Sequence, residues 1–171
     1  MEKKFKLGVI GAGFMASAIV NGALASNSLK KEEVIMSDVS LESLERAKNF
    51  GVSTTTDNLY LANNSEFVLF AVKPQSLSEV LYSVVNTDCK RFISIMAGIK
   101  REKISNSIKG AKVARCMPNT PCSIGSGAVG IDVSAFSSRE KEFVKSLFSP
   151  IANVVFVEED KLNAVTGVSG S

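Results

Sequence analysis

The chain has 171 residues, enough for one domain with a buried core, and its 45% hydrophobic and 22% charged residues are ordinary for a globular protein. The net charge of +3 is too small, and the basic residues too scattered, to indicate nucleic-acid binding. The sequence contains no histidine, which excludes Ser-His and Cys-His catalytic pairs and every metal site that needs imidazole. Any chemistry is therefore expected to depend on a cofactor, and no metal site is predicted.

Two further features concern the compartment. No apolar run reaches the length of a membrane span and no signal-peptide pattern is present, so we predict a cytoplasmic protein without membrane contact. The three cysteines, Cys89, Cys116 and Cys122, form no Cys-x-x-Cys pair, and we expect reduced thiols that pack in the interior.

The most informative pattern lies at the start of the chain. An apolar run, Phe5–Ile10, predicts a strand, and residues 15–25 predict a helix with one apolar face. Between them lies a Gly-x-Gly-x-x-Ala turn made by Gly11, Gly13 and Ala16. A strand, a glycine turn and a helix in this order are typical of a dinucleotide-binding fingerprint.

Each position of the fingerprint has a physical role. Gly11 permits the turn, Gly13 lets the backbone approach a pyrophosphate, and the small Ala16 lets the helix pack close to the strand. The backbone amides near Phe14 and Met15 are then expected to face the phosphates at the positive end of the helix dipole.

Further along the chain, short apolar or β-branched runs alternate with amphipathic stretches. The expected strands are residues 34–36, 52–55, 66–72, 91–96, 111–117, 127–131 and 153–157. The expected helices are residues 40–49, with Ser40 as N-cap, and 57–63, 74–85, 100–107 and 137–148, with another opening at 159–165.

This alternation predicts an α/β fold: a Rossmann-like, doubly wound, mostly parallel sheet with helices on both faces. Ligands of such sheets bind beyond the carboxyl ends of the strands. The residues predicted there are Gly11–Gly13, Ser37–Asp38, Ala71–Pro74, Ala97–Gly98 and Pro118–Asn119.

Asp38 follows the second strand, where a carboxylate can accept hydrogen bonds from the adenine-ribose hydroxyls. That carboxylate would repel a 2′-phosphate, which favours NADH, whereas Ser37 could donate to such a phosphate. A capping or solvated aspartate explains Asp38 equally well, so the cofactor is predicted as NADPH or NADH.

Two other segments remain open between a structural and a functional interpretation. Lys73 is either a cation where a strand meets solvent or part of a backbone segment, Ala71-Val72-Lys73-Pro74, that lies along the nicotinamide. The loop at Pro118–Pro121 holds Asn119 between two prolines, which suits either a substrate contact or a rigid turn.

Five blocks occur in order along the chain and together resemble the N-terminal domain of the pyrroline-5-carboxylate reductases. They are residues 10–18 (IGAGFMASA), 71–75 (AVKPQ), 94–99 (SIMAGI), 115–121 (RCMPNTP) and 166–171 (TGVSGS). The resemblance spans essentially the whole chain, and its second and fourth blocks are the most specific to that family.

The resemblance implies NAD(P)H-dependent reduction of 1-pyrroline-5-carboxylate to L-proline, the last step of proline biosynthesis. It implies cofactor contacts at Gly11, Gly13, Phe14, Met15, Ser37, Asn58, Ala71, Lys73, Pro74 and Ala97. It places Asn119 near the substrate, and implies that the turn Ser169-Gly170-Ser171 holds the substrate carboxylate through backbone amides. No general acid is assigned, because a protonated imine is already electrophilic.

The family continues past this turn into a helical domain that forms a homo-oligomer and completes the substrate site. We therefore expect residues 1–165 to be the NAD(P)-binding domain and 166–171 to begin the connection to that second domain. The chain alone is expected to bind the nucleotide and to reduce the imine poorly. Two alternatives are a nucleotide-binding module without catalysis, and a related reductase resembling the F420-dependent NADP reductases or 6-phosphogluconate dehydrogenases.

Overall fold

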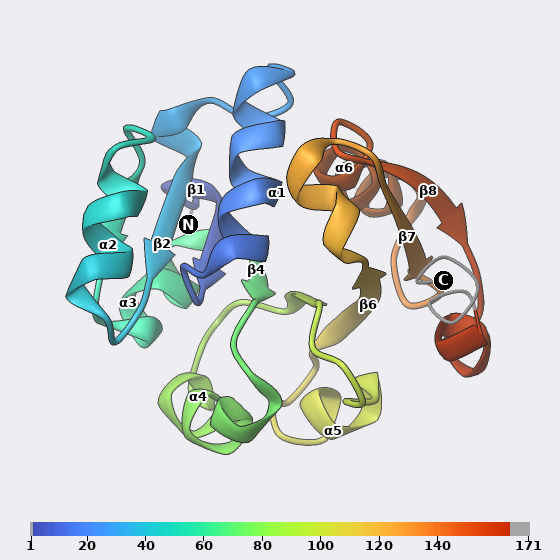
Figure 1. Cartoon of the computed structure of the whole chain (residues 1–171). Helices are drawn as coiled ribbons and strands as arrows, with labels where there is room; N and C mark the ends of the chain where they lie inside the picture. Colours follow the sequence, from blue (N-terminus) through green and yellow to red (C-terminus); the bar gives the residue numbers. More distant parts are fainter. Residues whose placement is uncertain (1, 165–171) are drawn as a thin grey trace.

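The computed structural model describes residues 2–164, of which the backbone alone is described at Thr120 and Ser123. Figure 1 shows one twisted sheet with helices packed on both of its faces. The sheet has eight strands in the order β3-β2-β1-β4-β5-β6-β7-β8. The strands are β1 (Phe5–Ile10), β2 (Val34–Ser37), β3 (Ser53–Thr55), β4 (Ser65–Phe70), β5 (Arg91–Ser94), β6 (Lys112–Pro118), β7 (Gly127–Asp132) and β8 (Ala152–Phe156).

The helices connect these strands across the two faces. They are α1 (Phe14–Ala25), α2 (Leu41–Lys48), α3 (Asn58–Asn63), α4 (Leu77–Val84), α5 (Arg101–Ser105) and α6 (Ser138–Phe148). Short 3-10 turns precede or link several of them: η1 (Lys31–Glu33), η2 (Pro74–Ser76), η3 (Thr120–Ile124) and η4 (Glu159–Lys161).

The core has two layers, one on each face of the sheet. In β4, Phe67 and Leu69 pack with residues of α1 and α6, whereas Val68 and Phe70 pack with residues of α3, α4 and α5. A strand buried on both faces is expected to be continuously apolar, which explains the uninterrupted run in β4. The doubly wound, mostly parallel fold that the sequence predicts is confirmed.

Strands β1 to β6 are mutually parallel, so their carboxyl ends share one edge of the sheet. The chain moves outward from β1 to β2 and β3 and then returns to β4 on the other side of β1. The carboxyl ends of β1 and β4 therefore flank the point where the strand order reverses, which is the usual ligand position in such sheets.

Local capping follows the sequence closely. The Ser40 side chain accepts a hydrogen bond from the Ser43 amide at the start of α2, and Ser137 forms a capping box with Glu140 at the start of α6. Asp57 caps α3 in the same way through Tyr60.

Several elements differ from the sequence prediction. The strand expected over residues 91–96 ends at Ser94, the helix expected over 74–85 opens with the 3-10 turn η2, and the helix expected over 100–107 is confined to Arg101–Ser105. The strand expected over residues 66–72 ends at Phe70, because the chain turns away from the ladder after the Ala71 amide has donated to Ile10 O. Strand β7 runs antiparallel to β6, since the intervening loop contains only the short turn η3 and is too brief for a crossover helix.

Candidate functional site: the carboxyl edge of the sheet

The glycine turn after β1 has the geometry that a dinucleotide requires. Gly11 has φ +101°, and a Cβ at this position would lie 2.5 Å from Ala71 O, so only glycine fits without strain. A Cβ at Gly13 would meet no atom within 4 Å, so the space in front of Gly13 is open. Within the described chain, no side chain caps α1 and its first turn has no acidic residue. The amides at the start of α1 are therefore free to bind an anion.

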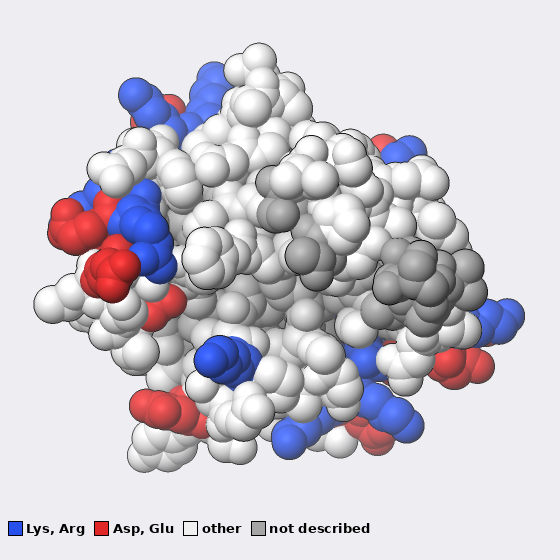
Figure 2. Space-filling view, viewed as in Figure 1, with Lys and Arg blue, Asp and Glu red and all other residues white. Residues whose placement is uncertain are grey.

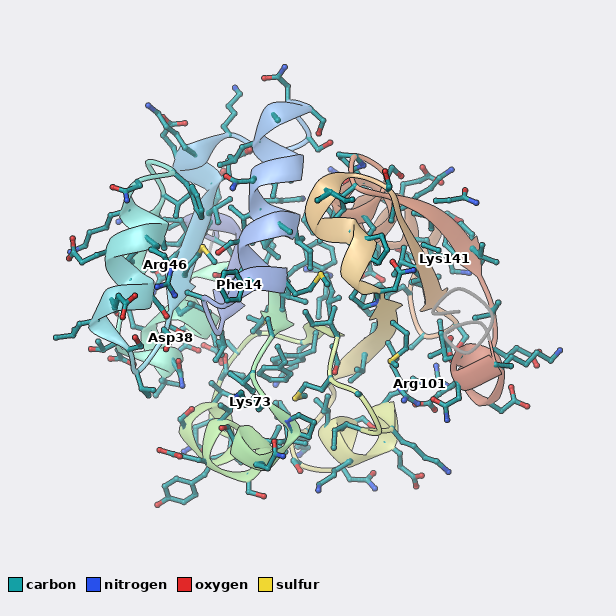
Figure 3. All side chains as sticks on the ribbon, in the orientation of Figure 1. Phe14, Asp38, Arg46, Lys73, Arg101 and Lys141 are labelled. Carbon is teal, nitrogen blue, oxygen red and sulfur yellow. The ribbon has the colours of Figure 1, made fainter. Side chains whose placement is uncertain are left out.

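Asp38 links this turn to the end of β2. Its Oδ2 accepts a hydrogen bond of 2.7 Å from the Ala12 amide, and its Oδ1 accepts one of 2.8 Å from the Ser40 amide. The carboxylate is thus fixed between the turn after β1 and the loop after β2. Asp38 is labelled in Figure 3. A carboxylate offers about four lone-pair positions, so it can accept further hydrogen bonds.

Ser37 lies one residue earlier in the chain. Its side chain donates a hydrogen bond, whereas that of Asp38 accepts two. Ser37 is 1% exposed, and its hydroxyl donates to Asn58 Oδ1 at 2.7 Å. Asn58 Nδ2 in turn donates to Ser83 Oγ at 3.1 Å, and Ser83 donates to Val80 O at 2.7 Å. This series of hydrogen bonds connects β2, α3 and α4 beside the glycine turn.

A pocket of about 550 Å³ lies between these elements. Its volume falls in the ordinary range of small-molecule sites. It is lined by Ile10, Gly11, Ser37, Asp38, Val39, Thr56, Asp57, Asn58, Leu59, Val72, Ser76, Glu79, Val80 and Ser83.

The structure brings together five of the predicted cofactor residues in this pocket: Gly11, Ser37, Asp38, Asn58 and Val72. Others lie along the same edge outside the pocket lining. They are Gly13, Phe14 and Met15 on the first turn of α1, Ala71, Lys73 and Pro74 after β4, and Ala97 and Gly98 after β5.

Two of these residues project into solvent. Phe14 is 90% exposed at the start of α1. Lys73 is exposed as the N-cap of η2, and its ammonium group makes no ion pair or hydrogen bond with the residues that the structure describes. Figure 3 shows both on the same side of the molecule, around the glycine turn. Figure 2, in the same view, shows few charged side chains over the centre of this face.

Asn119 follows β6 at the same edge, in a loop whose turn η3 packs against α1. Its Oδ1 accepts hydrogen bonds from the Ala128 amide at 3.0 Å and from the Cys122 thiol at 3.5 Å. This side chain therefore holds the β6–β7 loop closed. The predicted substrate residues Ser169, Gly170 and Ser171 lie outside the described residues.

The interior thiols are unsuited to reaction. Cys89, Cys116 and Cys122 are all buried and free, and desolvation by burial raises the pKa of each thiol above its usual value. In the described part of the chain no group of histidine, cysteine or acidic residues has the arrangement of a metal site. No helix among residues 2–164 is long and apolar enough to cross a membrane.

Sequence reasoning named Asn58 on α3 but missed the wall of the pocket formed by η2 and α4. Ser76, Glu79, Val80 and Ser83 recur at intervals of three and four residues, which places them on one face of a helix. That spacing was a usable signal, but only the sheet order shows that this face borders β1 and β2.

The sheet order, the glycine turn at the strand reversal and the adjacent pocket define a Rossmann-like nucleotide-binding fold. Comparison with known proteins agrees: the chain belongs to the family described as NADP oxidoreductase, coenzyme F420-dependent, whose model matches residues 6–98.

Relatives that are similar along the whole chain are pyrroline-5-carboxylate reductases, which confirms the resemblance noted in the sequence. That of a Synechocystis strain is 37% identical over 171 residues, and that of Methanosarcina acetivorans is 34% identical. Both alignments cover 97% of this chain but 63% of the relative. The chain therefore spans less than two thirds of the length of these relatives.

Solved structures lead to the same family. A pyrroline-5-carboxylate reductase from Coxiella burnetii superposes with a TM-score of 0.88 at 30% identity, covering 98% of this chain and 64% of that one. The Plasmodium falciparum pyrroline carboxylate reductase, solved with NADP bound, gives 0.84 at 28% identity, covering 99% of this chain and 64% of that one.

Proposed function

We propose that this chain binds NAD(P)H at the carboxyl edge of its sheet and supplies the cofactor-binding domain of a pyrroline-5-carboxylate reductase. The observation that carries the proposal is the open first turn of α1. Gly13 leaves space in front of the helix amides, and Gly11 allows β1 and the Ala71 carbonyl to approach closely. The similarity to reductases along 97% of the chain supports the same assignment.

Within this proposal each element has a task. The amides at the start of α1 bind the pyrophosphate, and the pocket beside Asp38 and Asn58 holds the adenosine. The segment Ala71–Pro74 and the residues Ala97 and Gly98 lie along the path toward the nicotinamide end. When bound, the reduced nicotinamide supplies a hydride to the imine carbon of 1-pyrroline-5-carboxylate, whose protonated nitrogen then becomes the amine of L-proline.

The chain's own contribution to that reaction is positioning. Asn119 closes the β6–β7 loop beside α1 and so shapes the substrate side of the edge. The turn Ser169–Ser171 is proposed to bind the substrate carboxylate. A protonated imine needs no strong acid, so orientation of the two reactants supplies the rate enhancement.

The same proposal covers the organisation of the protein. Residues 1–165 form the nucleotide-binding domain, and 166–171 lead toward a helical domain that forms a homo-oligomer and completes the substrate site. The relatives' greater length supports this arrangement. We place the activity in the cytoplasm, where reduced nicotinamide cofactors are supplied.

Calorimetric titration of the chain with NADH and with NADPH tests the nucleotide site. Saturable binding of at least one of them is expected, and 1-pyrroline-5-carboxylate with reduced nicotinamide should give little turnover by the chain alone. Failure of both nucleotides to bind would disprove the proposal. Turnover of reduced coenzyme F420 in preference to the imine would favour the alternative, an F420-dependent NADP reductase, to which the family description points.

A further inference from the structure

We infer that the pocket beside β2 selects an unphosphorylated adenosine ribose, so that the chain binds NADH in preference to NADPH. This inference rests on the proposed function, because it concerns the same nucleotide site. It goes further by assigning the discrimination to the charges and hydrogen-bonding directions of particular side chains.

The first argument is charge. Three carboxylates line the pocket, those of Asp38, Asp57 and Glu79, and no lysine or arginine is among its lining residues within the described chain. A 2′-phosphate carries close to two negative charges at neutral pH, so these carboxylates oppose it. A ribose with two free hydroxyls carries no charge and meets no such repulsion.

The second argument is that Asp38 cannot easily move away. Its two oxygens are held by the amides of Ala12 and Ser40 at 2.7 and 2.8 Å. Rotation of the carboxylate would leave both amides without this acceptor, which costs free energy chiefly at the partly buried Ala12 amide. The negative charge is therefore fixed at the end of β2, where ribose hydroxyls can donate to its remaining lone pairs.

The third argument is the direction of the hydrogen bonds. A backbone carbonyl can only accept, so the Ser83 hydroxyl must donate to Val80 O, and Asn58 must direct its amide N–H toward Ser83. The Asn58 oxygen then faces Ser37, whose hydroxyl donates to it. The Ser37 hydroxyl proton is thus already used, and Ser37 presents acceptor lone pairs alone, which suit ribose hydroxyls and not phosphate oxygens.

Arg46, a cation outside the pocket lining, is the alternative ligand to consider for the 2′-phosphate of NADPH. Arg46 on α2 donates to Glu42 at 2.7 Å and to Ser43 at 3.0 Å, and its side chain is 47% exposed. Figure 3 shows Arg46 on the same side of the molecule as Asp38. Arg46 does not line the pocket, so we assign it no phosphate contact.

The experiment is titration of the 171-residue chain with NADH and NADPH at low and at high ionic strength. At low salt the affinity for NADH should exceed the affinity for NADPH by about tenfold or more. This ratio of affinities should shrink as salt screens the repulsion of the 2′-phosphate. Asp38→Asn and Glu79→Gln should each raise the affinity for NADPH relative to that for NADH. The control Glu32→Gln, which removes an exposed carboxylate outside the pocket, should leave the ratio of the two affinities unchanged. Glu79 makes no hydrogen bond with a described residue, so Glu79→Gln tests charge even if Asp38→Asn weakens the fold.

Equal or tighter binding of NADPH would overturn the inference while leaving the proposed function intact. Loss of that NADPH binding in Arg46→Ala would then identify Arg46 as the phosphate ligand. Failure of both nucleotides to bind would instead disprove the proposed nucleotide site, and the inference with it.

Discussion

The Asp38 carboxylate accepts a hydrogen bond of 2.7 Å from the backbone amide of Ala12, and so joins the end of β2 to the glycine turn after β1. The sequence suggested two separate roles for Asp38, contact with a ribose or local capping. The structure shows the capping role directly, because Asp38 accepts from the amides of Ala12 and Ser40. The remaining lone pairs of the carboxylate are available for a ribose.

Asp38→Ala should therefore lower both stability and nucleotide affinity. The Ala12 amide loses its acceptor at a partly buried position, and the exposed Ser40 amide loses its acceptor as well, so we expect a loss of about 1–2 kcal/mol in the free energy of unfolding. Urea denaturation followed by circular dichroism measures this quantity. Unchanged stability would show that water replaces the carboxylate without cost.

Gly13→Ala should separate binding from folding. Gly13 has φ −78°, which alanine adopts readily, and an added Cβ meets no protein atom within 4 Å. The methyl group would nevertheless occupy the space proposed for the pyrophosphate. We expect stability within about 0.5 kcal/mol of the original chain and nucleotide affinity reduced about tenfold or more, measured by denaturation and calorimetry. Unimpaired binding would place the pyrophosphate elsewhere.

Gly11→Ala should mainly lower the stability of the fold, in contrast to Gly13→Ala. The positive φ and the Ala71 carbonyl 2.5 Å from an added Cβ require the backbone of β1 or β4 to shift. We expect a loss of about 2 kcal/mol or more in the free energy of unfolding. A thermal melt beside that of Gly13→Ala provides the comparison, and equal melting temperatures for the two variants would contradict the assigned strain.

The Glu140 carboxyl should make stability depend on acid pH. Burial opposes its ionisation, but the Ser137 amide, Arg91 and Lys112 outweigh this effect and lower its pKa from 4.5 to about 2. A depressed pKa in the folded state contributes stability above the unfolded value, and this contribution is lost as pH falls from about 4.5 toward 2.

Glu140→Gln should therefore cost about 2 kcal/mol at pH 7, and the difference from the original chain should disappear near pH 2. Denaturation at a series of pH values measures it. Glu142→Gln, an exposed position on the same helix, is the control and should change little. A constant difference at all pH values would exclude the ionised carboxylate as its cause.

Asn119 should act first on the loop that it closes. Asn119→Ala removes the acceptor of the Ala128 amide, so we expect about 1–2 kcal/mol of lost stability. Asn119→Asp retains the accepting oxygen and should recover most of this loss. If both variants are equally unstable, the amide nitrogen of Asn119 contributes as much as its oxygen.

The sequence by itself determined the fold class and the position of the glycine turn. The apolar runs of β1 and β4, the N-cap residues Ser40 and Ser137, and the spacing of Gly11 and Gly13 are local signals, since each depends on residues close together in the chain. Local signals specify elements, and alternation of elements specifies a doubly wound sheet.

The tertiary structure alone decided which side chains share the pocket. Ser37, Asn58 and Ser83 are separated by more than twenty residues at each step, and they meet because β2, α3 and α4 pack around the reversal of the strand order. The donor and acceptor directions along this series of hydrogen bonds are set by the backbone oxygen of Val80, which accepts from Ser83. The sequence gives no sign that this oxygen is the acceptor. The antiparallel pairing of β7 with β6 follows from the short connection between them and not from the apolar pattern of either strand, because that pattern is the same in both directions.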